Sequence, residues 1–197
     1  MNLNILEEKI FYYENVIDNP YNFIELIELN EKNIAGTNSG ITEWKKWTAS
    51  NDDYIFGYQK RISENIKDEN LDNYLECLHI SNTIENAIVS ASNDYAMHHK
   101  MDIGSLTPLS ISKYQLGASM GSHVDSYGDD TSPTISVVLY LNDDYEGGEI
   151  YFKEQDIEVK PSAGSLIIFP SYEPYYHESK PIVSGVKYMT PGFWYKR

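Results

Sequence analysis

Residues 134–142, with the sequence TISVVLYLN, have the strongest β-strand character in the chain. Their β-branched and apolar side chains predict a central strand of a sheet. The turn sequence NDDYEGG at 142–148 follows and leads into another predicted strand, EIYF at 149–152. Prolines and glycines then separate further predicted short strands at residues 157–160, 165–169, 175–178 and 185–188. Many short strands at regular spacing predict an antiparallel sandwich or barrel.

The same strand character extends back toward the middle of the chain. Leu109, Ile111 and Lys113 alternate with the residues between them, which is the period of two expected for a strand. Earlier residues differ, because apolar side chains recur at helical spacing after Asn19-Pro20 and again from about residue 68 to 98. The intervening segment mixes glycine and tryptophan residues and predicts loops with a short strand or two.

These patterns predict an α+β fold in a single domain of 197 residues. Residues 1–105 are expected to be mainly helical and to support one face of a β core formed by residues 106–197. No linker composition separates the two parts, so we expect them to fold as one unit.

Composition excludes several classes of function. The net charge is −15, and a negative field repels nucleic-acid phosphates and anionic lipid, so we expect neither nucleic acid nor membrane as a partner. Cys77 is the only cysteine, which excludes an intramolecular disulfide and thiol-rich zinc sites. The chain starts without the features of a secretory signal and has no long apolar run, so a cytoplasmic location is expected.

The segment GSHVD at 121–125 places His123 and Asp125 two residues apart. On an extended backbone, side chains at this spacing point to the same side. An imidazole and a carboxylate could therefore reach a single metal ion. The alternative interpretation of this pair is an ordinary surface turn.

His177 follows Asp125 by 52 residues on a different predicted strand, and Lys187 follows His177 by ten. A turn between them could place both side chains on one side of the sheet, although Lys187 could instead face solvent. Two histidines and one carboxylate form the facial triad of non-haem Fe(II) oxygenases, and zinc is the rival on ligand count. A buried lysine favours the oxygenase, because an unpaired buried ammonium group needs an anion such as a dicarboxylate cosubstrate.

With these residues in place, residues 110–194 resemble the Fe(II)/2-oxoglutarate-dependent dioxygenases, specifically the prolyl 4-hydroxylase-like branch. The resemblance rests on an ordered set of motifs. These are Tyr114, His123-x-Asp125, LYLN at 139–142, GGE at 147–149, Phe152, KPSAGSL at 160–166, FP at 169–170, His177, Pro181, Gly185 and Lys187. The step of ten residues from His177 to Lys187 matches the prolyl hydroxylase pattern, whereas many other branches have arginine there.

The resemblance implies a double-stranded β-helix, or jelly roll, whose cofactors are Fe(II), 2-oxoglutarate and O₂, with ascorbate as a further candidate. It implies that Lys187 pairs with the distal carboxylate of 2-oxoglutarate and that Tyr114 lines the cosubstrate pocket. Tyr140 is a weaker candidate for the same wall, with core packing as its alternative. The implied catalytic residues are also the metal ligands: His123, Asp125 and His177.

The activity implied by the resemblance is hydroxylation of a prolyl residue in a peptide or protein, with production of succinate and CO₂. Hydroxylation of a free amino acid or other small molecule is a second hypothesis, and a non-catalytic binding module that keeps the jelly roll is a third. An acidic, tyrosine-rich surface suits a basic or proline-rich peptide. We expect the loops within residues 34–60 and 126–133 to cover the mouth of the site.

Overall fold

The computed structural model describes residues 1–33, 45–46, 58–61, 71–126 and 132–197. These residues form two helices, α1 (Pro20–Asn33) and α2 (Leu71–His99), together with antiparallel sheets. The strands are β1 (Asn2–Glu7), β2 (Ile10–Glu14), β3 (Lys45–Lys46), β4 (Tyr58–Arg61), β5 (Ser110–Tyr114), β6 (Met120–His123), β7 (Ile135–Tyr140), β8 (Glu146–Gly147), β9 (Ile150–Phe152), β10 (Ile157–Val159), β11 (Leu166–Pro170), β12 (His177–Ser179), β13 (Ile182–Ser184) and β14 (Lys187–Trp194).

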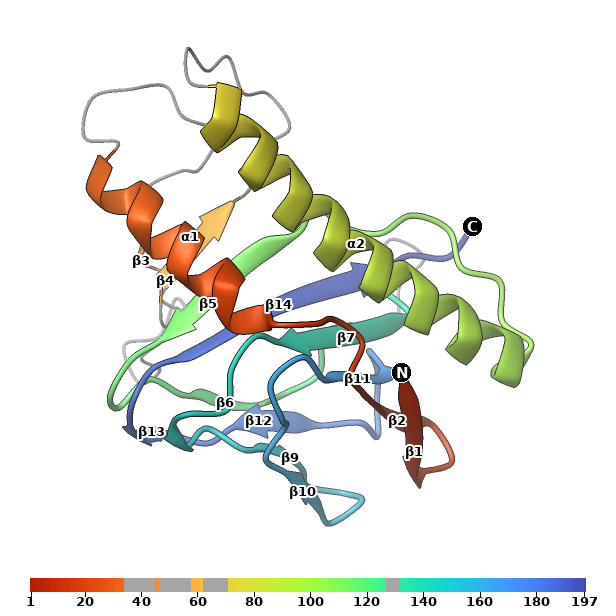
Figure 1. Cartoon of the computed structure of the whole chain (residues 1–197). Helices are drawn as coiled ribbons and strands as arrows, with labels where there is room; N and C mark the ends of the chain where they lie inside the picture. Colours follow the sequence, from red (N-terminus) through yellow and green to blue (C-terminus); the bar gives the residue numbers. More distant parts are fainter. Residues whose placement is uncertain (34–44, 47–57, 62–70, 127–131) are drawn as a thin grey trace.

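The strands form a large and a small sheet that face each other. The large sheet has eight strands in the order β1-β2-β11-β7-β14-β5-β4-β3, and the small sheet has four in the order β10-β9-β12-β6, while β13 pairs with β8. Both helices lie on one side of the large sheet, and the small sheet lies on its other side (Figure 1). This arrangement confirms the predicted α+β fold with a β core supported by helices on one face.

The alternation of side chains along the central strands explains the two cores. Ile135, Val137 and Leu139 of β7 pack beneath the helices. The residues of β7 and β11 that point the other way pack toward the small sheet: Val138, Tyr140, Ile167 and Phe169. Because the large sheet is covered on both faces, β7 and β11 carry apolar residues on both faces, with Ser136 as a polar exception in β7.

Helix α2 supplies the helical side of the first core. Its buried residues recur at steps of three and four, which places them on one stripe: Ile80, Ile84, Ile88, Ala91 and Tyr95. Burial of each large side chain contributes about 1.5–3 kcal/mol. Leu75 and Leu78 fit the same spacing in the sequence, but both are exposed.

Strands β1 and β2 lie within residues 1–105, where the sequence predicts mainly helix. Residues 10–13 of β2, IFYY, are buried, and β2 pairs with β11 at the side of the large sheet. A short apolar run of this kind cannot be assigned to strand or helix by periodicity, because both faces are covered. The mainly helical description of residues 1–105 is therefore incomplete, since this region also contributes edge strands to the large sheet.

Two of the short strands expected in the mixed segment are present as β3 and β4, which extend the opposite edge of the large sheet. The remainder of the segments expected to cover the mouth, at 34–44, 47–57 and 127–131, lies outside the described residues. In the part of the chain that is described, neither helix combines the length and the apolar character needed to span a membrane.

Candidate active site

The pairing of β6 with β12 brings two histidines together. His123 is the last residue of β6 and His177 is the first of β12, and their Cα atoms are direct partners in the antiparallel register. Asp125 follows β6 by two residues. One ligand atom from each of the three side chains lies within 4.8 Å of those of the other two. The structure therefore joins the three residues that the sequence spacing singled out.

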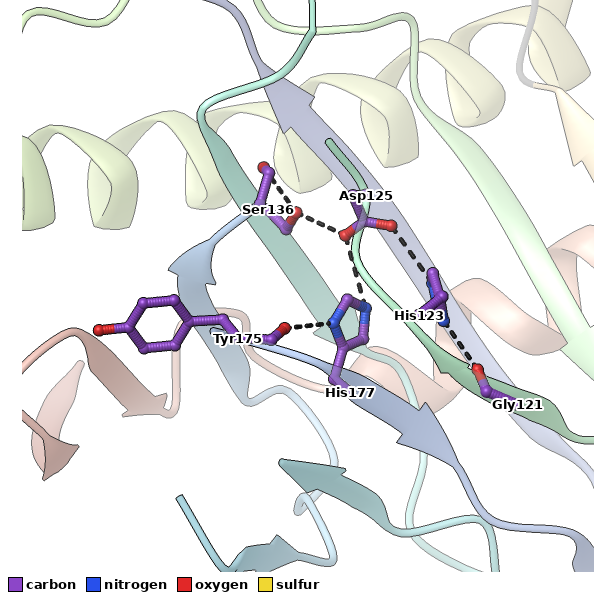
Figure 2. Close-up of polar contacts among 7 residues, drawn as sticks. Gly121, His123, Asp125, Ser136, Tyr175 and His177 are labelled. Atoms are coloured by element: carbon purple, nitrogen blue, oxygen red, sulfur yellow. Dashed lines mark hydrogen bonds and ion pairs between the residues drawn. The ribbon is translucent and has the colours of Figure 1, made fainter. Parts of the chain in front are cut away.

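Each histidine directs Nε2 toward the carboxylate between them. His123 Nε2 lies 3.3 Å from Asp125 Oδ1, and His177 Nε2 lies 3.5 Å from Asp125 Oδ2 (Figure 2). On the far side of each ring, Nδ1 contacts a backbone carbonyl, that of Gly121 at 2.8 Å and that of Tyr175 at 3.2 Å. A carbonyl accepts a hydrogen from Nδ1, which leaves Nε2 with the lone pair that a metal ion requires.

The electrostatics of the cluster act differently on its three members. Burial lowers the pKa of His177 to about 4, so this imidazole is neutral at physiological pH. Burial also lowers the pKa of His123, but the hydrogen bond and charge of Asp125 outweigh it, and the pKa is raised. Burial raises the pKa of Asp125, but its histidine and serine partners outweigh that effect and lower it, so the carboxylate is ionised.

A cavity of about 310 Å³ opens beside the triad, between the two sheets. This volume is within the range of small-molecule sites. His123, Asp125 and His177 line it together with Lys187 and residues of β5, β7 and β14. The predicted site residues Tyr114 and Tyr140 are also on its wall.

Lys187 is 1% exposed and directs its ammonium group toward polar atoms of the opposite sheet. Lys187 Nζ donates to the carbonyl of Gly148 at 2.8 Å and to Ser179 Oγ at 2.5 Å. Among the described residues, no carboxylate lies within ion-pair distance of it. Burial lowers the pKa of Lys187 to about 7, although the charge of Glu149 acts to raise it. An anion entering the cavity would supply the missing counter-charge.

Tyr114 lies directly beside Lys187, because the two residues are Cα partners in the pairing of β5 with β14. Lys187 Nζ lies 4.9 Å from the centre of the Tyr114 ring, which is a cation–π distance. Burial raises the pKa of both Tyr114 and Tyr140, so both phenols are neutral hydrogen-bonding groups in the cavity wall.

Gly148 explains the glycine pair in the sequence. Its φ is +69°, a conformation that side chains disfavour, and a Cβ at this position would lie 2.5 Å from Ile182 Cδ1 and 3.4 Å from Lys187 Cδ. Glycine therefore allows a positive φ close to Ile182, in the conformation from which the carbonyl of Gly148 accepts a hydrogen bond from Lys187.

Three serines of the site were not singled out by the sequence. Ser136 and Ser171 stand behind Asp125, and Ser179 contacts Lys187. Two signals were present: Ser136 interrupts an apolar strand, and Ser179 lies two residues after His177, on the same side of β12. Neither signal identifies the hydrogen-bond partner of the serine, which is known only from the fold.

Comparison with known proteins agrees with this geometry. Residues 109–196 match the 2OG-Fe(II) oxygenase superfamily. The matched segment contains His123, Asp125, His177 and Lys187. It is 28% identical over 169 residues to a PKHD-type hydroxylase of Thermosynechococcus vestitus, covering 81% of this chain and 69% of that protein. These matches support a 2-oxoglutarate-dependent dioxygenase, an enzyme class that uses Fe(II), 2-oxoglutarate and O₂.

Solved structures share the fold of this oxygenase. A viral collagen prolyl hydroxylase from Paramecium bursaria chlorella virus-1, solved with 2-oxoglutarate, superposes with a TM-score of 0.63 at 17% identity, covering 96% of this chain and 97% of that one. A prolyl hydroxylase from Trichoplax adhaerens, solved with a peptide of hypoxia inducible factor, gives a TM-score of 0.67 at 16% identity and covers 95% and 84%. The predicted double-stranded β-helix is confirmed.

The donor set fits the metal of the superfamily. Two imidazoles that direct Nε2 toward one point, and one ionised carboxylate, make the three-ligand face that suits Fe(II). All three donors lie at the cavity wall, so a bound ion would keep positions open toward the cavity.

Proposed function

We propose that this oxygenase hydroxylates a prolyl residue of a peptide or protein. In this proposal His123, Asp125 and His177 hold Fe(II), and Lys187 binds the distal carboxylate of 2-oxoglutarate. The observation that carries the assignment is a three-ligand cluster that shares one cavity with a buried lysine lacking a carboxylate partner among the described residues.

When bound, Fe(II) supplies O₂ activation, in which 2-oxoglutarate becomes succinate and CO₂ while one oxygen atom enters a C–H bond of the substrate. The protein orients the reactants. Ser179 is two residues from His177 along β12, a step of about 7 Å, so the lysine and the triad bind opposite ends of an elongated dicarboxylate. The charge-assisted hydrogen bond between Lys187 and the distal carboxylate of 2-oxoglutarate would form in a desolvated site, where such bonds are strong.

The other end of the cavity supports a prolyl substrate. Along β14, every second residue from Lys187 onward lines the cavity. The two farthest from Lys187 are Pro191 and Phe193. Thr107 and Pro108 complete this end of the wall. None of the four carries a charge, so this region favours an uncharged, compact side chain over an ionised one.

The decisive experiment incubates the protein with Fe(II), 2-oxoglutarate and proline-containing peptides, and measures succinate together with the mass of the peptide. We expect succinate formation coupled to a mass gain of one oxygen. The matched substrate replaces proline by alanine and should give neither. Turnover with free proline or another small molecule but with no peptide would contradict the peptide assignment and support the small-molecule hypothesis.

The residue assignment has a test of its own. His177→Ala should abolish coupled turnover while leaving the circular dichroism spectrum unchanged. His98→Ala is the matched control, because His98 is an exposed histidine at the end of α2. Full activity of His177→Ala would remove this residue from the metal site.

A further inference from the structure

The three members of the triad are held in different ways. His123 and His177 lie on β6 and β12, where the ladder of the small sheet fixes them opposite each other. Asp125 lies beyond the end of β6, outside that ladder. Something other than strand pairing must therefore fix the orientation of its carboxylate.

That support comes from the large sheet. Ser136 Oγ of β7 donates to Asp125 Oδ2 at 2.6 Å, and Ser136 Oγ lies 2.8 Å from Ser171 Oγ, just after β11 (Figure 2). Ser136 is 1% exposed and Ser171 is fully buried. The backbone adds a clamp at the same place, because the amide of Ser126 donates to the carbonyl of Ser171 at 2.8 Å.

The directions of the two hydroxyl hydrogen bonds follow from the ionised state of Asp125. An ionised carboxylate only accepts hydrogen bonds, so Ser136 must donate its single hydroxyl hydrogen to Asp125. In the contact between the serines, Ser171 is then the donor. The order Ser171 to Ser136 to Asp125 polarises the Ser136 hydroxyl and strengthens its bond to the carboxylate.

We propose that Ser136 and Ser171 form a hydroxyl relay that positions Asp125 for metal binding, with Ser136 acting directly and Ser171 acting only through Ser136. The relay ties the acidic ligand to the large sheet, whereas both histidines belong to the small sheet. This inference rests on the proposed metal site and adds two positioning residues to it.

The relay is tested by metal affinity rather than by turnover. Apoprotein is titrated anaerobically with Fe(II), or with Co(II) as a spectroscopic probe, and the dissociation constant is measured by calorimetry. Ser136→Ala should weaken binding by about 10–100-fold, the usual effect of removing a partner of a metal ligand. Ser171→Ala should weaken it by a smaller factor. Ser136→Cys, which keeps a weak donor of similar size, should fall between Ser136→Ala and the unmodified protein.

The double variant separates a relay from two independent effects. If Ser171 acts only through Ser136, the variant lacking both hydroxyls should bind metal no more weakly than Ser136→Ala alone. Losses that multiply would overturn the relay. Ser165→Ala is the matched control, because Ser165 is also fully buried but donates to the carbonyl of Ser162, outside the triad.

Failure of the relay and failure of the proposed function give different results. If the unmodified protein binds metal, His177→Ala abolishes binding and Ser136→Ala binds within twofold of the unmodified protein, only the relay is wrong. An equal loss in Ser165→Ala would also overturn it. If the unmodified protein binds no divalent metal, or His177→Ala binds equally well, both proposals fail together. Thermal unfolding of each apo variant shows whether a loss of metal affinity is caused by misfolding. If Ser136→Ala is misfolded, the affinity of Ser136→Cys tests the relay instead.

Discussion

Lys187 shows how one residue gains its role from its surroundings. An ammonium group in water would be an ordinary surface charge, but here it is enclosed by Tyr114, Ser179 and the carbonyl of Gly148. These groups hydrogen-bond or stack with the lysine, yet none of them neutralises its charge. A site of this kind is pre-organised for an anion because part of the desolvation cost is met before binding.

Replacing this lysine should affect the cosubstrate far more than the metal. For Lys187→Met, which keeps the length but loses the charge, we expect the apparent KM for 2-oxoglutarate to rise by about 10–100-fold, equivalent to about 1.5–3 kcal/mol for a lost charge-assisted hydrogen bond. The metal dissociation constant of the variant should stay within about threefold of that of the unmodified protein. Steady-state kinetics and metal titration measure the two quantities, and an unchanged KM would exclude Lys187 from the cosubstrate site.

The pH dependence of cosubstrate binding follows from the same residue. Burial lowers the pKa of Lys187 to about 7 in the free protein, and a bound carboxylate would raise it. Binding is therefore strongest below pH 7, where the lysine is already protonated, and must take up a proton above it. We expect affinity for 2-oxoglutarate to fall by up to about tenfold per pH unit as pH rises above about 7.

Calorimetry of metal-loaded protein between about pH 6 and pH 9 measures this slope. Lys187→Met should bind weakly with no such slope. A slope of the same size in that variant would assign the pH dependence to another group.

At the scale of elements, two strand pairings create the site. The register of β6 with β12 sets the histidines opposite each other, and the register of β14 with β5 sets Lys187 beside Tyr114. A slip of one residue would turn every one of these side chains to the other face. The short β8–β9 connection then brings the carbonyl of Gly148 to the lysine.

Gly148→Ala should damage both stability and cosubstrate binding. The new methyl group would collide with buried Ile182 while the backbone keeps a positive φ, so we expect a loss of about 2–4 kcal/mol in the free energy of unfolding. A backbone shift here would also move the carbonyl that accepts from Lys187, so we expect the KM for 2-oxoglutarate to rise. Urea denaturation and steady-state kinetics measure the two effects.

Gly117→Ala is the matched control, since Gly117 also has a positive φ of +79°, but no atom lies within 4 Å of the position that a methyl group would take there. It should lose only about 1 kcal/mol of stability and keep its KM. Equal effects in the two variants would show that backbone conformation, and not crowding against Ile182, is responsible.

At the scale of the whole molecule, the site joins the two sheets. The histidines come from the small sheet, and Asp125 is hydrogen-bonded to the large sheet through Ser136. A metal ion held by all three would therefore bind only the state in which the sheets face each other, and it should stabilise that state by mass action.

We expect Mn(II), as a redox-stable substitute, to raise the free energy of unfolding by about 2.7 kcal/mol at a hundred times its dissociation constant. A chelator should reverse the change. Asp125→Ala should lose most of this stabilisation, whereas Ser165→Ala should keep it. Denaturation with and without metal gives the comparison, and an equal metal-induced shift in Asp125→Ala would place the ion elsewhere.

The sequence predicted the central strand at 134–142, most of the buried stripe of α2, and a site that contains His123, Asp125, His177 and Lys187. These features can be predicted because each depends on local spacing: TISVVLYLN is mostly apolar and β-branched, buried residues of α2 recur at three and four, and His123 and Asp125 share one side of an extended segment. The ordered set of motifs, including the ten-residue step from His177 to Lys187, resembled a known family, and this resemblance placed distant residues in one site.

The other features depend on how distant strands pack together. Periodicity could not assign IFYY in β2, because a strand buried on both faces has no alternating pattern. Nor could it show that Ser136 and Ser171 support Asp125, since these residues are 11 and 35 positions from their partners along the chain. Such contacts exist only once separate strands lie side by side, and local sequence carries no record of which strands will meet.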